Sequence, residues 1–236
     1  MLLRSIVIGI SRAISSTIFV VLVLLYFTQP NYLRAFTPQL FGINKVAPNI
    51  FTDQRLKTNA IKRAVATAER NAAKFFKNQT AAPTYIVCFN PKCANVFGAL
   101  PLGLTLGYHR IIIAPDGFSQ QVFNHERIHA DLHALVGITG VYTTPFPMWF
   151  NEGLAEYVSG FGCQGGVPNT NDIKRVKTAE TIWQWQLLVS DKQYRRHYGA
   201  ACRAVEEISQ RIGKNRLSEI VHNARNQIQF LSDIGS

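Results

Sequence analysis

The feature of this sequence that most constrains its fold is a pair of histidines four residues apart, within a stretch of helical periodicity. Residues 125–129 read H-E-x-x-H. Side chains at i and i+4 of a helix lie on one face, one turn apart, so His125 and His129 can bind one metal ion. Glu126 would lie beside that ion, where a carboxylate can act as a general base.

The surrounding sequence predicts a helix over residues 119–136. Ser119 is a suitable N-cap and Gly137 a suitable stop. Between them, apolar residues recur at mostly helical spacing: Val122, Phe123, Ile128, Leu132, Leu135 and Val136. His133 extends the row of histidines by one more turn, too far for one ion to bind all three on a straight helix. We therefore interpret His133 as a histidine beside the site or at the surface.

A second helix is predicted to begin at Pro147, because proline suits the first turn of a helix. Glu152 and Glu156 within it are again i and i+4 on one face. The sequence thus predicts two helices, each with two polar side chains on one face.

These two segments resemble the gluzincins, the thermolysin-like and aminopeptidase-like group of zinc peptidases. In that group a second helix supplies a glutamate ligand from a W-x-x-E-G-x-A-like stretch, matched here by Trp149, Glu152, Gly153 and Ala155. The resemblance implies one Zn²⁺ per chain, with His125, His129 and Glu152 as ligands and Glu126 as the base. It also implies that Glu156 holds the second ring N–H of a ligand histidine.

The resemblance covers about residues 84–229, but only the two motifs are specific. It implies an edge strand before the H-E-x-x-H helix that pairs with extended substrate, and residues 107–114 are the candidate. As plain structure, this segment could equally be a central strand. An oxyanion donor is commonly a tyrosine or histidine in this group. We rank Tyr198 first, ahead of His197, Tyr157 and Tyr142, although each tyrosine also suits a packing role.

Three protein ligands leave a fourth zinc position open to water. The resemblance therefore implies hydrolysis of peptide bonds by a metal-activated water, with Glu126 as the general base and a peptide or protein as substrate. The alternative is a catalytically silent domain with structural zinc that acts as a membrane-anchored interaction module. An intact Glu126 favours the enzyme. The absence of a G-x-M-E-N stretch argues weakly against an aminopeptidase.

The N-terminus is predicted to anchor the chain in a membrane. Ile6–Phe27 is apolar except for Ser, Thr and Arg12, and about 20 such residues span a bilayer. A cleaved signal peptide is the rival interpretation, but no A-x-A-like site follows. A buried core helix is a third option, disfavoured because no polar face is visible. We expect a signal-anchor over 1–28, a proline-containing tether over 29–50 and a zinc peptidase-like domain over 51–236.

The four cysteines suggest disulfides and a catalytic domain outside the cytoplasm, in the periplasm if the source is bacterial. Three pairings are open, and Cys88–Cys93 is the local one, which would leave Cys163–Cys202. Four buried free thiols are the alternative.

The formal charge of +11 is uneven, because residues 1–80 hold 11 Lys or Arg against two acids. Basic residues next to a bilayer suggest contact with anionic lipid. A solvated basic face is the plainer interpretation. We expect no nucleic acid partner, since no binding motif is present.

The predicted fold class is α+β. A small mixed β-sheet is expected to pack on the zinc-motif helix, with a mainly helical C-terminal part after it and a transmembrane helix before it. Elements are predicted at 53–76 (helix), 84–89 and 107–114 (strands), and near 172–189, 191–212 and 214–229 (helices).

Overall fold

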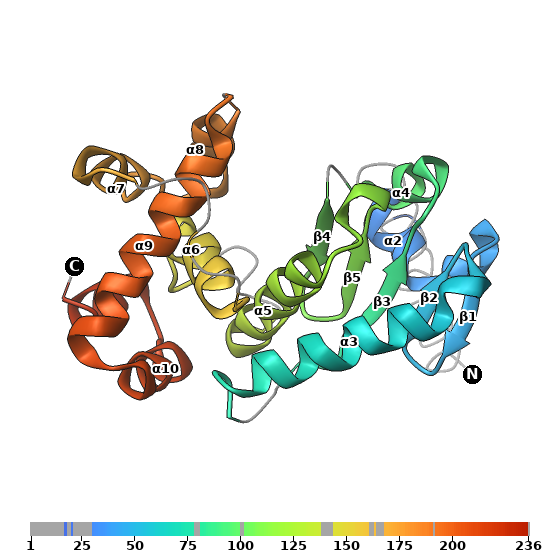
Figure 1. The fold of residues 1–236 in the computed structure, drawn as a ribbon, viewed down its shortest axis with the longest axis horizontal. Helices are drawn as coiled ribbons and strands as arrows, with labels where there is room; N and C mark the ends of the chain where they lie inside the picture. Colours follow the sequence, from blue (N-terminus) through green and yellow to red (C-terminus); the bar gives the residue numbers. More distant parts are fainter. Residues whose placement is uncertain are drawn as a thin grey trace, which may run out of the picture.

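A five-stranded mixed sheet forms the centre of the N-terminal half of the chain (Figure 1). The computed structural model describes residues 17, 20, 30–77, 81–99, 102–137, 144–160, 163, 168–190 and 192–235. Across the sheet the strands are β1 (Asn44–Ala47), β2 (Ile50–Thr52), β3 (Thr84–Val87), β5 (Arg110–Ile113) and β4 (Gly103–Leu106). β2, β3 and β5 run parallel, whereas β1 and β4 are antiparallel to their neighbours. The expected α+β class with a mixed sheet is confirmed.

Alternate residues of the central strands face two different layers of helices. Ile86 and Ile112 share an apolar cluster with residues of α2 (Pro30–Phe36) and α4 (Pro91–Phe97). Tyr85 and Ile111 share another with residues of α3 (Thr58–Ala73) and α5 (Gln120–Val136). Because both faces of β3 and β5 are covered, these strands are continuous apolar runs, as is typical of parallel strands.

The C-terminal half is helical and packs on the other side of α5 (Figure 1). Its two main helices, α6 (Met148–Val158) and α9 (Tyr194–Ile212), cross closely at Gly153, where a Cβ would lie only 2.4 Å from Ala201 O. The shorter helices are α7 (Thr170–Val176), α8 (Ile182–Val189), α10 (Lys214–Asn223) and α11 (Gln227–Asp233). Since Leu132 of α5 joins the same apolar cluster as Phe150 of α6, α5 connects the two halves.

The prediction that residues 29–50 form a tether is wrong for residues 30–50. This segment contains α2, the 3-10 helix Pro38–Phe41, β1 and the first residue of β2. Ala35 and Ile43 are buried in the cluster that covers one face of the sheet. The folded domain therefore begins well before residue 51.

Other predicted elements are shorter or divided. The helix predicted over 53–76 is α3, preceded by a 3-10 turn at Arg55–Lys57, and the strand predicted over 84–89 ends at Val87. The helix predicted near 191–212 is α9, whereas those predicted near 172–189 and 214–229 are each divided in two. Residues 107–114 contain β5, which lies between β3 and β4, so the edge strand before α5 is β4.

Two disulfides are present. Cys88, just after β3, pairs with Cys93 in α4, and Cys163 pairs with Cys202 in α9. The second pair joins the segment after α6 to α9 across 39 residues of sequence. The expected disulfides are therefore present, and of the three possible pairings the structure has Cys88–Cys93 with Cys163–Cys202.

The predicted span Ile6–Phe27 lies, apart from Thr17 and Val20, outside the described residues. Within the part of the chain that the structure describes, no helix combines the length and the apolar character needed to cross a bilayer.

Candidate metal centre

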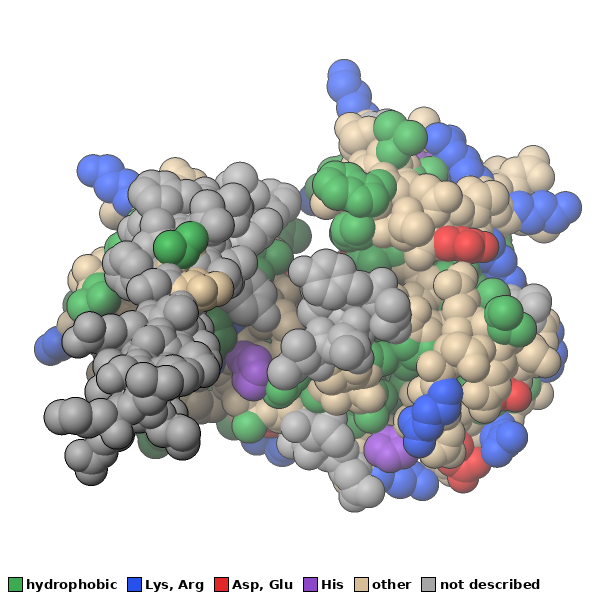
Figure 2. All heavy atoms as spheres, turned by 180° about the vertical axis from the view of Figure 1, so that it is seen from behind, with side chains coloured by type: hydrophobic (Ala, Val, Ile, Leu, Met, Phe, Trp, Pro, Cys, Tyr) green, Lys and Arg blue, Asp and Glu red, His purple; other side chains and the backbone are tan. Residues whose placement is uncertain are grey.

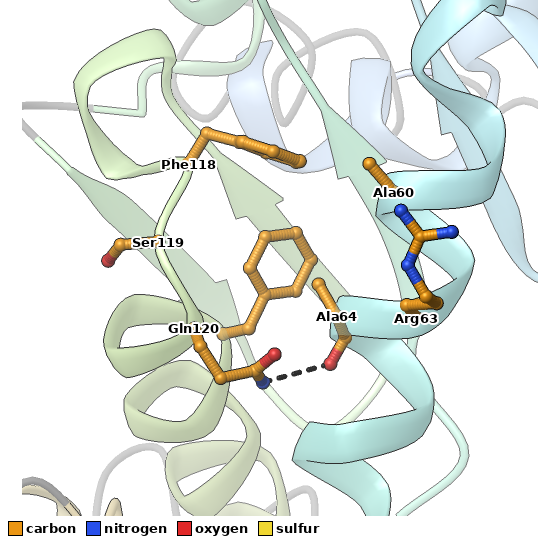
Figure 3. A pocket seen from close by; sticks show the side chains of 7 residues that line it. Ala60, Arg63, Ala64, Phe118, Ser119 and Gln120 are labelled. Atoms are coloured by element: carbon orange, nitrogen blue, oxygen red, sulfur yellow. Dashed lines mark hydrogen bonds between the residues drawn. The ribbon is translucent and has the colours of Figure 1, made fainter.

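The motif helix α5 begins at a side-chain cap and is tied to α3. Ser119 Oγ accepts a hydrogen bond from Val122 N–H at 3.3 Å, so the predicted N-cap is confirmed. Gln120 Nε2 donates to Ala64 O of α3 at 3.0 Å (Figure 3). The helix ends at Gly137, whose φ of 66° glycine adopts without strain. Both ends of α5 thus lie where the sequence predicts.

A pocket of about 260 Å³ lies between α3 and the start of α5 (Figure 3). It is lined by Ala60, Arg63, Ala64, Phe118, Ser119, Gln120 and Phe123. None of these side chains is a histidine or a carboxylate. This pocket therefore offers neither metal ligands nor a general base.

The structure brings His125, His129 and Glu152 together, with one ligand atom of each within 4.8 Å of the others. The Nε2 atoms of the two histidines are 2.9 Å apart. Glu152 Oε2 lies 3.4 Å from His125 Nε2 and 3.5 Å from His129 Nε2. The histidines come from one face of α5 and the glutamate from α6, so the packing of these two helices creates the cluster.

The far side of each imidazole faces a hydrogen-bond acceptor. His125 Nδ1 lies 3.1 Å from Glu156 Oε1, and His129 Nδ1 lies 2.8 Å from Asn151 Oδ1. Each Nδ1 therefore carries a hydrogen, and each Nε2 of the neutral ring presents a lone pair to the centre. Two lone pairs and a carboxylate oxygen converge there. Only a cation, either a proton or a metal ion, makes that arrangement favourable.

Without a metal ion, the electrostatics of the cluster favour a proton at that centre. Burial lowers the pKa of His125, but its hydrogen bonds to Glu152 and Glu156 outweigh burial and hold that pKa well above the usual value. Burial alone would raise the pKa of Glu152, yet positive charge on His129 and hydrogen bonds from both histidines hold it well below its usual range. Glu152 is therefore ionised at neutral pH, as a metal ligand must be.

The candidate base Glu126 is held by β4. Thr105 Oγ1 lies 2.6 Å from Glu126 Oε2 and donates a hydrogen bond to it. Gly103, two residues earlier on the same face of β4, leaves room for the glutamate, since a Cβ there would lie 2.7 Å from Glu126 Oε1. β4 thus positions this carboxylate through a hydrogen bond at one residue and through the lack of a side chain at another.

Tyr198, the first-ranked candidate for the oxyanion donor, lies next to the cluster. Its ring centroid is 6.2 Å from that of His125, and its other side packs edge-on against Trp185 at 5.1 Å. Burial raises the pKa of Tyr198 well above its usual value, and the negative charge of Glu152 raises it further. The phenol therefore keeps its proton and can donate a hydrogen bond.

The structure gives Tyr157 and His197 other surroundings. The Tyr157 hydroxyl donates a hydrogen bond to Ser209 Oγ at 2.8 Å, which is a contact between α6 and α9. His197 is buried within α9, and Tyr142 lies outside the described residues. His133 Nδ1 lies 2.9 Å from Gly107 O, to which it donates a hydrogen bond. Burial lowers the pKa of His133, which favours the neutral imidazole.

Sequence reasoning missed Asn151 and Thr105. Asn151 directly precedes Glu152 in the second motif, and this position next to a predicted ligand is the signal that could have identified it. Thr105 lies in a Gly-rich stretch without clear periodicity. Nothing in that stretch predicts that residues 103–106 form a strand against α5.

No related protein guides the interpretation of this site. Comparison with protein-family models, with curated proteins and with solved structures found no match. What the site can do therefore follows from its donors. His125, His129 and Glu152 are close enough to hold a metal ion. Two imidazoles and one carboxylate are a donor set of catalytic zinc sites, in which a fourth position is open to water.

Proposed function

We propose that this chain is a gluzincin-like zinc metallopeptidase. The observation that carries the proposal is the convergence of His125, His129 and Glu152, with the carboxylate of Glu126 held beside them by β4. A zinc ion in that donor set would activate water and polarise the carbonyl of a peptide bond. A purely structural site would have no use for an ordered carboxylate next to a ligand histidine.

The residues of the chain have distinct roles in this proposal. Glu126 accepts the proton of the attacking water and later delivers it to the leaving amine. Thr105 orients that carboxylate through its hydrogen bond at 2.6 Å. Tyr198 donates to the developing oxyanion. Glu156 and Asn151 hold the imidazoles in the tautomer that directs Nε2 to the ion.

The substrate is a peptide in extended form that pairs with β4. The strand order places β4 at one edge of the sheet, and within the described part of the chain it pairs only with β5. An edge strand presents backbone N–H and C=O groups that can bind another strand. Because Thr105 and Gly103 belong to β4, a peptide on this edge lies beside Glu126.

We further propose an extracytoplasmic location, with the N-terminal segment as a single-pass membrane anchor. The support is the apolar run Ile6–Phe27 in the sequence and the two disulfides, which persist in oxidising compartments. The competing function is a catalytically silent zinc domain that serves as a membrane-anchored interaction module.

Metal content and hydrolysis of a peptide library by the purified full chain in detergent test the proposal. Wild type and Glu126→Gln should each retain about one zinc per chain. The wild type should cleave peptides and Glu126→Gln should not, because the amide cannot accept the proton. His129→Ala should lose the zinc, whereas the exposed His222→Ala serves as the matched control and should keep it.

Three results would contradict parts of this proposal. Zinc retained at full stoichiometry in His129→Ala would remove the ligand assignment. Zinc without hydrolysis in the wild type would favour the silent module. Wild-type rates in Glu126→Gln would exclude Glu126 as the base.

A further inference from the structure

Helix α8 has apolar residues on both of its faces. Its sequence, Ile-Trp-Gln-Trp-Gln-Leu-Leu-Val, contains no charged residue. Trp185 is buried, and Leu188 and Val189 pack on the C-terminal core. On the other side Trp183 and Leu187, one turn apart, are 78% and 79% exposed.

These two residues belong to a larger exposed group, the α8 patch, made of Ile182, Trp183, Leu187 and Tyr194. Single exposed apolar residues are common on soluble proteins and need no explanation. Here four such residues occur within 13 residues of sequence, and two of them are aromatic. Figure 2 shows apolar side chains gathered at this end of the C-terminal helices, with lysine and arginine side chains beside them.

Two exposed basic residues, Lys192 and Arg195, lie close in sequence to the α8 patch. Between Glu180 and Arg196 the sequence has three basic residues and two acids. Lys192 and Arg195 are exposed, whereas Arg196 is paired with Asp172 at 2.8 Å. Arg195 Nε donates to the hydroxyl of Tyr194 at 3.1 Å, so a cation and a phenol lie together at the border of the patch.

We infer that the α8 patch docks on the surface of an anionic lipid bilayer. Tryptophan and tyrosine prefer the boundary between headgroups and acyl chains, where the ring is in an apolar layer and its polar group is solvated. Lysine and arginine next to them attract anionic headgroups. The α8 patch combines both kinds of side chain.

The size and position of the patch favour lipid over a protein partner. A stable protein interface takes about 20–30 residues from each side, and the patch offers four apolar side chains. α8 lies at the outer end of the C-terminal helices, away from the sheet (Figure 1). A projecting patch of this kind can enter a deformable lipid surface without a matching groove. The inference does not depend on the metal centre.

Tryptophan fluorescence in vesicles with brominated acyl chains tests the inference on the full chain. The chain has three tryptophans, of which Trp149 and Trp185 are buried and only Trp183 is exposed. Bromine quenches a tryptophan that it contacts, so quenching reports Trp183 even if the N-terminal segment anchors the chain. We expect quenching in vesicles of brominated phosphatidylcholine and phosphatidylglycerol, and none in Trp183→Phe.

Variants separate the α8 patch from other surfaces. Leu187→Ser should shift the equilibrium between the docked and undocked states on the order of tenfold towards the undocked state, and should thereby reduce quenching. Ile228→Ser, at a residue of α11 that is 85% exposed, is the matched control and should leave quenching unchanged. Lys192→Glu with Arg195→Glu should also reduce it, as should high salt.

Each contrary outcome overturns the inference. Equal emission in brominated and ordinary vesicles would mean that Trp183 does not meet lipid. A loss of quenching with Lys62→Glu and Arg63→Glu on α3, but not with Leu187→Ser, would move the lipid surface to α3. A shift of Trp183 emission with protein concentration in the absence of lipid would mean that a second copy of the chain covers the patch.

Discussion

Replacing Arg127 with methionine should destabilise the apo protein by about 3–5 kcal/mol. Arg127 is one of the two variable positions of the H-E-x-x-H motif, and its side chain is fully buried. It contacts Asp131 Oδ2 at 2.8 Å, Glu69 Oε2 at 2.9 Å and Ala81 O at 3.0 Å. This cation is therefore the common partner of three acceptors beneath the metal motif.

The magnitude follows from what the substitution leaves behind. Asp131 is also fully buried, and without Arg127 the remaining hydrogen bond in the structure is from Ala81 N–H at 3.4 Å. An uncompensated buried carboxylate costs about 3–5 kcal/mol. The side chain of Glu69 is 30% exposed, so water can replace its partner and its loss adds at most about 1 kcal/mol. Methionine fills most of the space of the arginine stem, which keeps the cavity cost small.

Urea unfolding in the presence of EDTA, at constant detergent and with disulfides intact, measures this effect without metal linkage. The exposed Arg70→Met on α3 is the matched control and should change stability by less than about 0.5 kcal/mol. The double variant Arg127→Met with Asp131→Leu should recover most of the loss, because no buried charge remains. A loss under about 1 kcal/mol in Arg127→Met at unchanged m-value, or strict additivity in the double variant, would refute the reasoning.

Three further substitutions test the candidate site. Thr105→Val should lower kcat about tenfold or more, because the hydrogen bond to the base is lost, and should leave the zinc content unchanged. Thr105→Ser should restore the rate. Equal kcat in the Val and Ser variants would contradict this role. Gly153→Ala should cost about 1–3 kcal/mol in urea unfolding, since the new Cβ meets Ala201 O, and an unchanged midpoint would mean that α6 and α9 separate freely. Glu156→Gln should weaken zinc affinity about 10–100-fold in chelator competition, through its contact with His125 Nδ1, and unchanged affinity would exclude that role.

Local signals predicted the motif helix well. The cap at Ser119, the stop at Gly137 and the apolar spacing between them all act within a few residues of each other. These local signals therefore predict the helix and the shared face of its two histidines. That Glu152 comes to meet them depends on packing between α5 and α6, which periodicity does not contain. Its prediction came from the resemblance of the second motif.

The error at residues 29–50 has a physical reason. Three prolines in this segment suggested an extended linker. Pro30 and Pro38 instead stand at the first positions of helices, where the fixed φ is favourable and no amide hydrogen is needed. Proline content alone does not separate a linker from a run of short helices. The apolar residues Ala35 and Ile43, which are buried here, carried the better signal.

The edge strand β4 escaped prediction because its four residues include a glycine and follow a Gly-rich stretch. Its position nevertheless joins two parts of the proposed function. Residues 103 and 105 share the face that touches Glu126, whereas Leu104 and Leu106 pack on the opposite cluster. The outer backbone of the same strand is the proposed binding edge for the peptide. A peptide that orders β4 by pairing with it would thereby also fix Thr105 and, through its hydrogen bond, the base. On the proposed function, substrate binding and the placement of Glu126 are therefore coupled through one short strand.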